Sequence, residues 1–355
     1  MIDGKNVLIT GGTGSFGKRC LEIFLSRYKP QKLIVFSRDE LKQHEMRLCG
    51  YNHHALRYFI GDVREKDRLK RAMADVDIVI HAAALKQVPI CEYNPSEAVK
   101  TNVIGTQNII DTAIDCGVKR VIALSTDKAV NPVNLYGATK LCAEKLFIQG
   151  NVYSGKKPTR LSCVRYGNVI GSRGSVIPLF VEQRKTGKLS ITDTRMTRFW
   201  ITLDQAVDLV IKALHHMQGG EIFVPRIPSM KIVHLAKAIA PECKIEISGV
   251  RPGEKLHEVL TTEEEGRGTL EYDGMYVITP HRDWWKQKNY KTGVPVPDGF
   301  IYASNTNPQV LTIDELRQIL NSELAPTYRP IPSAGTVGQS PPVHRGRTPT
   351  PPCPV

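Results

Sequence analysis

A short apolar strand followed at once by a glycine-rich loop constrains the fold of this chain more than any other feature of its sequence. Residues 5–10 have the composition of a buried strand, and Gly11, Gly14 and Gly17 then recur every third residue before an amphipathic stretch that ends near residue 28. Glycines at this spacing allow a tight turn and let the backbone approach a pyrophosphate at a helix N-terminus. The stretch predicts the strand, loop and first helix of a dinucleotide-binding sheet.

Strand and helix patterns alternate along the residues that follow. Further strands are expected at residues 32–36, 56–60, 77–84, 118–124 and 160–165, and helices at residues 94–116 and 136–149. This alternation predicts an α/β protein with a Rossmann-like, doubly wound parallel sheet. Helices expected at residues 203–217 and 233–240 indicate a smaller C-terminal α/β lobe.

The length of 355 residues, 41% of them hydrophobic, is enough for one large core or two domains. We expect residues 1–165 to form the dinucleotide-binding domain, with a core that extends into later strands, and residues 166–325 to form a substrate-binding lobe interleaved with it. Residues 326–355 are rich in proline and contain no acidic residue. Such a segment cannot bury enough apolar surface to fold, so a disordered tail is expected.

Composition argues against several classes of protein. No apolar run is long enough to span a membrane and no cleavable leader precedes the first strand, so a cytoplasmic protein without a membrane partner is expected. The eight cysteines form no C-x-x-C pair, so neither a metal site nor a disulfide framework is expected. The net charge of +13 indicates a solvated basic surface or attraction of a nucleotide diphosphate. Nucleic acid is not expected, because the basic residues are spread out and no recognition module is present.

The ends of the second, third and fourth expected strands carry residues suited to a dinucleotide. Ser37, Arg38 and Lys42 offer hydroxyl and cationic groups to a phosphate, so NADP is favoured over NAD. NAD remains possible because Asp39 follows Arg38. The alternative to a phosphate contact for Arg38 is that its side chain is merely solvated. The other expected cofactor contacts come from the glycine loop, an acidic strand end, a run of small residues and a lysine near the nicotinamide end: Thr13, Ser15, Phe16, Asp62, Val63, Ala82, Ala83, Ala84 and Lys86.

The strongest indication of chemistry follows the strand expected at residues 118–124. Ser125 and Thr126 come next, and a helix begins near Tyr136. Tyr136 and Lys140 are four residues apart and share one helix face, where an ammonium would lower the pKa of the phenol. A hydroxyl of Ser125 or Thr126 would hold the substrate oxygen that the phenolate deprotonates. The arrangement predicts a base directed at an alcohol, as hydride removal from a sugar or steroid requires.

Later residues offer contacts for a substrate. Asn168 follows the strand expected at residues 160–165, at the edge of the sheet where open α/β proteins bind ligands. Arg198 and Arg251 are isolated arginines in expected loops. Two arginines could clamp a diphosphate, or both could lie on the surface.

Together these residues resemble the extended short-chain dehydrogenase/reductase superfamily. Residues 81–89 (HAAALKQVP), 125–129 (STDKA), 165–169 (RYGNV) and 196–200 (MTRFW) further resemble UDP-N-acetylglucosamine 4,6-dehydratases. The intact Tyr136 is similar to the soluble inverting branch of that family, whereas the membrane-bound branch usually has methionine there. The resemblance covers about residues 3–325.

The resemblance implies a reaction in which Tyr136, as phenolate, takes the proton of the carbon 4 hydroxyl while hydride passes to NADP. Lys128 would then act as a neutral base on carbon 5, and Asp127 as a protonated acid toward the departing carbon 6 hydroxyl. The hydride returns to carbon 6. This gives a UDP-4-keto-6-deoxy-L-arabino sugar, the first step toward pseudaminic acid and related glycans. A surface ion pair is the alternative for Asp127 and Lys128, and Lys86 is the next candidate for the base.

The resemblance also implies site residues and assembly. A homo-oligomer, dimeric or larger, is expected. Two other functions remain open: an NADP-dependent nucleotide-sugar epimerase of the same superfamily, and a non-catalytic dinucleotide-binding regulator. The expected catalytic residues are Thr126, Asp127, Lys128, Tyr136 and Lys140, and the expected contacts to a UDP-sugar are Lys86, Thr126, Asn168, Val176, Arg198, Arg251 and Glu254.

Overall fold

The computed structural model describes residues 1–171, 176–280, 285 and 290–323. The expected proline-rich tail at residues 326–355 lies outside the described residues. Within the described part, no helix is both long and apolar enough to cross a membrane.

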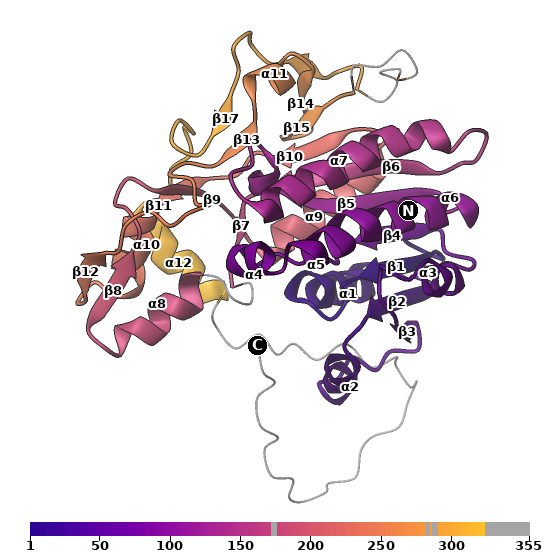
Figure 1. The fold of residues 1–355 in the computed structure, drawn as a ribbon, viewed down its shortest axis with the longest axis horizontal. Helices are drawn as coiled ribbons and strands as arrows, with labels where there is room; N and C mark the ends of the chain where they lie inside the picture. The colour runs from indigo at the N-terminus through magenta and orange to yellow at the C-terminus, as the bar shows by residue number, and fades with distance from the viewer. Residues whose placement is uncertain (172–175, 281–284, 286–289, 324–355) are drawn as a thin grey trace, which may run out of the picture.

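A ten-stranded sheet forms the centre of the molecule, in the order β16-β14-β15-β10-β6-β5-β4-β1-β2-β3 (Figure 1). The strands from β10 to β3 in this order run parallel, and the three at the other edge are antiparallel. The predicted α/β fold with a doubly wound parallel sheet is confirmed. The strands are β1 (Asn6–Thr10), β2 (Lys32–Ser37), β3 (Leu56–Ile60), β4 (Ile78–His81), β5 (Arg120–Thr126), β6 (Arg160–Tyr166), β10 (Ile222–Pro225), β14 (Thr269–Tyr272), β15 (Met275–Ile278) and β16 (Val294–Pro295).

Helices cover both faces of this sheet. α1 (Ser15–Arg27) connects β1 to β2 and α6 (Gly105–Asp115) connects β4 to β5, in opposite directions along the sheet. Because parallel crossovers are right-handed, these two helices lie on opposite faces. α9 (Leu203–His216) packs on α1, whereas α3 (Lys66–Ala72) and α7 (Leu135–Tyr153) pack on α6. Figure 1 shows α7 and α9 on opposite sides of β5 and β6.

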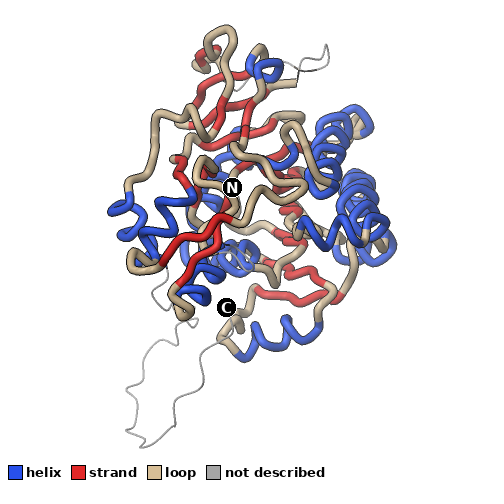
Figure 2. Tube along the Cα trace, turned by 60° about the vertical axis from the view of Figure 1, so that its left-hand side comes forward, coloured by secondary structure: helices blue, strands red, loops and turns tan. Residues whose placement is uncertain are grey.

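The residues after β6 contribute both to this sheet and to a smaller lobe (Figure 2). The lobe has its own apolar core, which includes Phe180, Leu189, Trp200, Leu235 and Leu316. Its elements are β7 (Asn168–Val169), α8 (Val176–Arg184), β8 (Lys188–Ile191), β9 (Thr197–Ile201), β11 (Ser229–Lys231), α10 (Ile232–Ile239), β12 (Lys244–Ile247) and α12 (Ile313–Glu323). β13 (Val259–Thr261), α11 (Glu263–Gly266) and β17 (Tyr302–Ala303) lie instead beside β14 and β15, and Leu260 and Tyr302 belong to the core of the large sheet (Figure 1).

The helix predicted at residues 94–116 is present at residues 95–115, with a π turn in its middle. It is divided into α5 (Pro95–Val99), a π turn η1 (Lys100–Ile104) and α6. A π turn accommodates an extra residue and changes the direction of the side chains that follow. Asn102 in this turn is buried, accepts from the N–H of Leu85 at 2.8 Å and donates to the carbonyl of Leu85 at 2.9 Å. The turn therefore fixes the loop between β4 and α4 (Val88–Tyr93) beside the sheet edge.

Candidate active site

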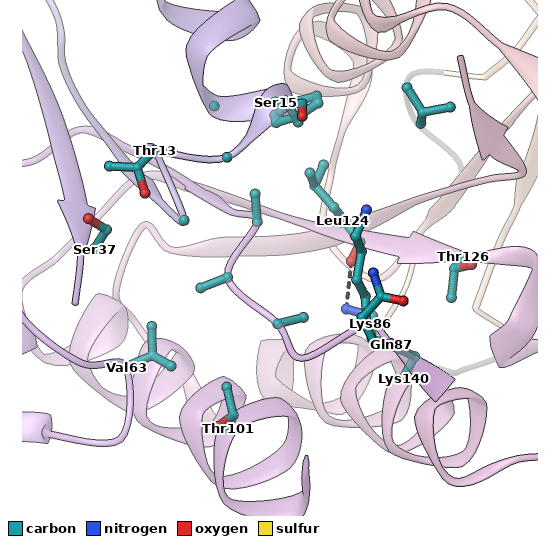
Figure 3. A pocket seen from close by; sticks show the side chains of 18 of the residues that line it. Thr13, Ser15, Ser37, Val63, Lys86, Gln87, Thr101, Leu124, Thr126 and Lys140 are labelled. Carbon is teal, nitrogen blue, oxygen red and sulfur yellow. Dashed lines mark hydrogen bonds between the residues drawn. The ribbon is translucent and has the colours of Figure 1, made fainter. Parts of the chain in front are cut away.

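A cavity of about 570 Å³ lies along the carboxyl ends of the parallel strands. Every residue expected to bind the cofactor lines it, from the glycine loop to Lys86. In Figure 3, Thr13, Ser37 and Val63 lie toward one end of the cavity, and Lys86, Thr126 and Lys140 toward the other. The cavity is thus long enough to connect the phosphate-binding loop to the expected catalytic residues.

Two glycines of the loop, Gly11 and Gly17, leave no space for a side chain. A Cβ at Gly11 would lie 3.0 Å from the backbone of Ala82, and Gly11 has a φ of +65°, which disfavours other residues. A Cβ at Gly17 would lie 2.5 Å from the backbone of Gly12, so α1 packs directly on the loop. Gly14 caps α1 and has no side chain to satisfy the first N–H groups. These N–H groups are suited to bind a phosphate.

The end of β2 provides cationic groups at one end of the cavity. Arg38 Nη1 lies 3.6 Å from Asp62 Oδ2, and the Arg38 side chain is about half exposed. The carboxylate of Asp39 caps α2 (Glu40–Leu48) by accepting from the N–H of Lys42 at 2.9 Å, and it also pairs with the Lys42 ammonium. Arg38 and Asp39 both line the cavity, but the Asp39 carboxylate is engaged by its own helix.

The carboxylate of Asp62, an expected cofactor contact, is held in place by Arg64. This carboxylate accepts from the backbone N–H of Arg64 at 2.9 Å and from the Arg64 guanidinium at 2.7 Å and 2.9 Å. Burial raises the pKa of Asp62, but Arg64 and Arg38 lower it more, so the pKa lies below its ordinary value. An ionised Asp62 on the cavity wall can accept from an amino group while Arg64 holds it in place.

The opposite end of the cavity is built from β5, a short 3-10 helix η2 (Asp127–Ala129) and α7. Asn134 caps α7 by accepting from the N–H of Gly137 at 2.8 Å. A Cβ at Gly137 would lie only 2.1 Å from the carbonyl oxygen of Lys128. The glycine after Tyr136 therefore lets α7 begin directly against η2, which brings Tyr136 beside Thr126.

Tyr136 has a different cationic neighbour from the one expected. Burial raises the pKa of Tyr136 to about 12, while Lys128 and a hydrogen bond with Thr126 lower it. Lys140 instead donates to the carbonyl oxygen of Leu124 at 2.7 Å (Figure 3). The sequence predicted that Lys140 lowers the pKa of Tyr136; in the structure, Lys128 is the cation that does so. Four-residue spacing places Tyr136 and Lys140 on one helix face but does not fix where the lysine side chain ends.

A cluster of five charged residues lies beneath Thr126, which we call the charged cluster. Asp127 is fully buried, and its Oδ1 accepts from the Thr126 hydroxyl at 2.9 Å and lies 3.0 Å from Lys128 Nζ. Lys128 Nζ also lies 3.5 Å from Oε1 of the buried Glu258. The members of the charged cluster are Asp127, Lys128, Arg198, Lys255 and Glu258.

Lys128 is an ammonium in this arrangement. Burial lowers its pKa, but Asp127 and Glu258 raise it more, so the pKa lies well above its ordinary value. The neutral Lys128 that the expected base requires is therefore not the favoured form in this arrangement, and its role as a neutral base in the reaction stays a prediction. The expectation considered burial and omitted the second carboxylate, Glu258. Lys86, also on the cavity wall, has a pKa lowered first by burial and then by Lys128.

Only some of the expected substrate contacts line the cavity. Thr126, Lys86 and Asn168 line the cavity, and Asn168 Oδ1 is buried without a hydrogen-bond partner among the described residues. Arg198 is buried away from the cavity wall, with Nε 3.7 Å from Glu258 Oε1. The other expected contacts are also absent from the wall of this cavity: Val176, Arg251 and Glu254.

Two residues of the charged cluster, Lys255 and Glu258, were not identified from the sequence. Lys255 Nζ lies 3.7 Å from Glu258 Oε2, and Glu258 immediately precedes β13. β13 pairs with β17 far along the chain, and no motif around Glu258 indicates that it lies beside Lys128. The described residues contain no group of three or more His, Cys, Asp or Glu side chains placed to hold a metal ion.

The sequence matches the family described as "Polysaccharide biosynthesis protein" over residues 7–280. It is 53% identical over 330 residues to a Campylobacter jejuni protein named UDP-N-acetylglucosamine 4,6-dehydratase (inverting), which covers 90% of this chain and 98% of the relative. A Rickettsia akari protein named UDP-glucose 4-epimerase is 46% identical over 329 residues, with 90% and 96% covered. Both relatives are therefore similar to this chain over almost their whole length.

A solved structure is similar over nearly the same span. The X-ray structure of Pen from Bacillus thuringiensis is 40% identical, with a TM-score of 0.84, and the alignment covers 91% of this chain and 99% of that one. The aligned part of this chain includes both the large sheet and the smaller lobe.

Proposed function

This chain belongs to the polysaccharide biosynthesis protein family, among the relatives of the inverting UDP-N-acetylglucosamine 4,6-dehydratases, and we propose that it carries out that reaction. It is then a hydro-lyase acting on a nucleotide sugar. The resemblance predicted from its motifs is confirmed. The observation that carries the assignment is the charged cluster directly beneath Thr126 and Tyr136, because an epimerase needs no acid and base for elimination.

The cofactor we propose is NADP. The glycine loop fits a dinucleotide pyrophosphate, because a Cβ at Gly11 would fill the space beside Ala82 that such a group approaches. Arg38 on the cavity wall supports a 2'-phosphate, since Asp39 is already engaged in capping α2. When bound, the nicotinamide supplies the acceptor and later the donor of hydride.

Tyr136 is proposed to remove the proton of the carbon 4 hydroxyl. Its pKa is high in the free protein, and the two groups that lower it, Lys128 and Thr126, are those that line the same end of the cavity. The Thr126 hydroxyl also donates to Asp127 and so links the oxidation site to the charged cluster. A sugar bound here would meet Tyr136 and Lys128 together.

Asp127 and Lys128 are proposed to carry out the elimination. The ketone formed at carbon 4 acidifies the carbon 5 proton, which Lys128 removes, and Asp127 protonates the departing hydroxyl of carbon 6. Asp127 Oδ2 makes no hydrogen bond with any of the described residues, so this oxygen has no competing partner, although it is buried and Asp127 does not line the cavity. Lys128 must lose its proton before it can act, because the free protein holds it as an ammonium.

Substrate contacts are proposed for the residues that share the cavity wall with Lys128, namely Lys86 and Asn168. Arg251 is exposed, in the loop that leads to Lys255, and remains a proposed contact for the diphosphate. Assembly as a homo-oligomer is supported by exposed apolar side chains on consecutive turns of α4, α5 and η1: Ile90, Tyr93, Val99 and Ile104.

The proposed function is tested by incubating the protein with NADP and UDP-N-acetylglucosamine and measuring the mass of the product. We expect the loss of one water from the sugar. Tyr136→Phe should remove all turnover, because no other group replaces its oxygen. An unchanged mass with an inverted carbon 4 would identify an epimerase, and no turnover of any nucleotide sugar would identify a binding protein.

A further inference from the structure

Glu258 is a buried carboxylate with three cationic neighbours, of which Lys128 lines the cavity. It is 2% exposed. Oε1 lies 3.5 Å from Lys128 Nζ and 3.7 Å from Arg198 Nε, and Oε2 lies 3.7 Å from Lys255 Nζ. Oε2 makes no hydrogen bond with any of the described residues. Burial of a carboxylate this incompletely satisfied is costly, and such groups mark functional sites.

The backbone holds Glu258 in place independently of its side chain. Its N–H donates to the Ser304 hydroxyl at 2.9 Å, and its carbonyl accepts from the N–H of Ser304 at 2.8 Å. Ser304 continues the edge formed by β17 and β13, which are paired antiparallel. The position of the Glu258 backbone is therefore fixed by the sheet edge and does not require the ion pairs, whereas the carboxylate itself is held by its cationic neighbours.

Lys128 connects this carboxylate to the cavity. Lys128 lines the cavity wall, whereas neither Asp127 nor Glu258 does. Its amine lies 3.0 Å from Asp127 Oδ1 and 3.5 Å from Glu258 Oε1, so two carboxylates share one ammonium. Either carboxylate could accept the proton that Lys128 must lose: on Asp127 that proton would later pass to the departing hydroxyl, whereas Glu258 does not line the cavity and has no such second task. With the Lys128 proton on Glu258, Asp127 must already carry the proton that it gives to the hydroxyl.

We propose that Glu258 is the positioning residue that makes Lys128 a base, by holding its amine at the cavity wall and accepting its proton; this inference rests on the proposed function. In the step, one Nζ–H bond of the Lys128 ammonium breaks and an O–H bond forms on Glu258. The products are a neutral amine and a neutral carboxylic acid, so atoms and charge balance. The amine then takes the carbon 5 proton.

The electrostatic surroundings are consistent with this role. Burial and the nearby Asp127 raise the pKa of Glu258 above its ordinary value, although Lys128, Arg198 and Lys255 lower it. A carboxyl group with a raised pKa accepts a proton at less cost. A bound sugar excludes water from Lys128, which favours the neutral pair over the ion pair. The titratable groups around the pair, besides those of the charged cluster, are Tyr136 and Lys86.

The proposal predicts a distinctive pH dependence. A transfer from Lys128 to Glu258 exchanges no proton with solvent, so removal of the carbon 5 proton should vary little with pH around neutrality. In Glu258→Gln, the Lys128 proton must leave to solvent, and the rate should rise about tenfold per pH unit until Lys128 is neutral. Removing the carboxylate also lowers the pKa of Lys128. This lowers the pH at which the rate stops rising, but the rate still increases with pH.

The experiment follows UDP-N-acetylglucosamine deuterated at carbon 5, with NADP bound, from mildly acidic to mildly alkaline pH. Release of deuterium to water reports the Lys128 step, and absorbance of reduced nicotinamide reports oxidation at carbon 4. For Glu258→Gln we expect deuterium release to fall about 100-fold at neutral pH and to rise with pH. Oxidation should stay within a few-fold of wild type. Glu258→Asp should restore part of the release and the flat profile.

Ser304→Ala provides the structural control, because it removes the hydrogen bond to the Glu258 backbone but keeps the carboxylate. In this variant, the rate of deuterium release should remain nearly independent of pH. A flat profile in Glu258→Gln would overturn the proposal and identify Asp127 as the acceptor, and equal losses of oxidation and release would reduce Glu258 to a structural role. If wild-type protein releases no deuterium at all, the proposed function itself fails.

Discussion

At the scale of single residues, the order of side chains along β5 and η2 decides the chemistry. Thr126 ends the strand, and Asp127 and Lys128 form the 3-10 turn that follows, so a hydroxyl, an acid and an amine meet without any long-range contact. Their proton state depends on groups from elsewhere. Lys128 is held as an ammonium by Asp127 and Glu258, and it is the cation that lowers the pKa of Tyr136.

This coupling predicts that Lys128→Ala affects oxidation as well as elimination. Loss of the Lys128 charge should raise the pKa of Tyr136, so less phenolate is present at a given pH. The pH profile for reduction of bound nicotinamide should therefore move to more alkaline pH, with about a tenfold slower rate for each unit of pKa gained. Reduced nicotinamide should accumulate, because the next step lacks its base.

The measurement is the initial absorbance change of reduced nicotinamide as a function of pH, with Lys119→Ala as a control. Lys119 is exposed and pairs with Asp77, away from the cavity. A profile for Lys128→Ala that coincides with that of wild type would contradict the coupling between Lys128 and Tyr136.

Arg38 determines the preference for the cofactor in our account. Arg38→Ala should weaken NADP binding by about 1–3 kcal/mol, the contribution of a hydrogen bond to a charged group, and leave NAD binding nearly unchanged. Titration of both cofactors measures this, with the exposed Arg57, which does not line the cavity, changed to alanine as the control. Equal losses for NADP and NAD would show that Arg38 does not recognise the 2'-phosphate.

At the scale of elements, the start of α7 is fixed by close backbone contact with η2. Gly137→Ala would place a methyl group 2.1 Å from the carbonyl oxygen of Lys128, and backbone atoms cannot move aside without shifting the helix. We expect a loss of about 1–3 kcal/mol in the free energy of unfolding, as for other overpacked sites, and a larger loss of turnover. Chemical denaturation and product formation measure the two effects; a variant as stable and active as wild type would contradict this packing.

A buried ion network joins α7, β6 and α11. Arg165 forms paired hydrogen bonds with Glu144 at 2.7 Å and 2.9 Å, and with Glu265 at 2.8 Å for both contacts. It thereby holds the helix that carries Tyr136 and Lys140 against α11. Breaking such a pair from one side leaves a buried charge uncompensated, which is costly.

This network predicts a loss of stability in acid. Burial raises the pKa of Glu265, but Arg165 lowers it more, so the pKa in the folded protein is below its ordinary value. A carboxylate of this kind stabilises the fold above the unfolded pKa, about 4.3, and the stabilisation is lost as the pH falls through the folded value. Melting temperature should decline over this range, less steeply in Glu265→Gln; parallel curves would contradict the assignment.

At the scale of the whole molecule, the sequence predicted what depends on local pattern. The glycine loop, the alternation of strands and helices, and the stretch from Thr126 to Lys140 are each continuous in the chain, so spacing indicates the backbone geometry, though not that Lys140 donates to the carbonyl oxygen of Leu124. The parallel sheet followed from the alternation. The residues expected at the cofactor end line one cavity, because they follow neighbouring strands whose carboxyl ends meet at one edge.

The features that the sequence did not predict depend mostly on contacts between distant parts of the chain. Glu258 lies beside Lys128 only because β13 pairs with β17 near η2, and the sequence around it has no pattern that shows this. Arg198 looked like an isolated loop arginine, but it lies in β9 and faces Glu258. The π turn at Asn102 was hidden because the helix pattern continues on both sides of it.

The most direct test of the account is NMR of the product formed from UDP-N-acetylglucosamine and NADP in heavy water. We predict a 4-keto-6-deoxy sugar with one deuterium at carbon 5 and the L-arabino configuration, because Lys128 removes the carbon 5 proton and solvent supplies its replacement with inversion. A product that keeps its carbon 6 hydroxyl, or that carries the original hydrogen at carbon 5, would contradict elimination at the charged cluster.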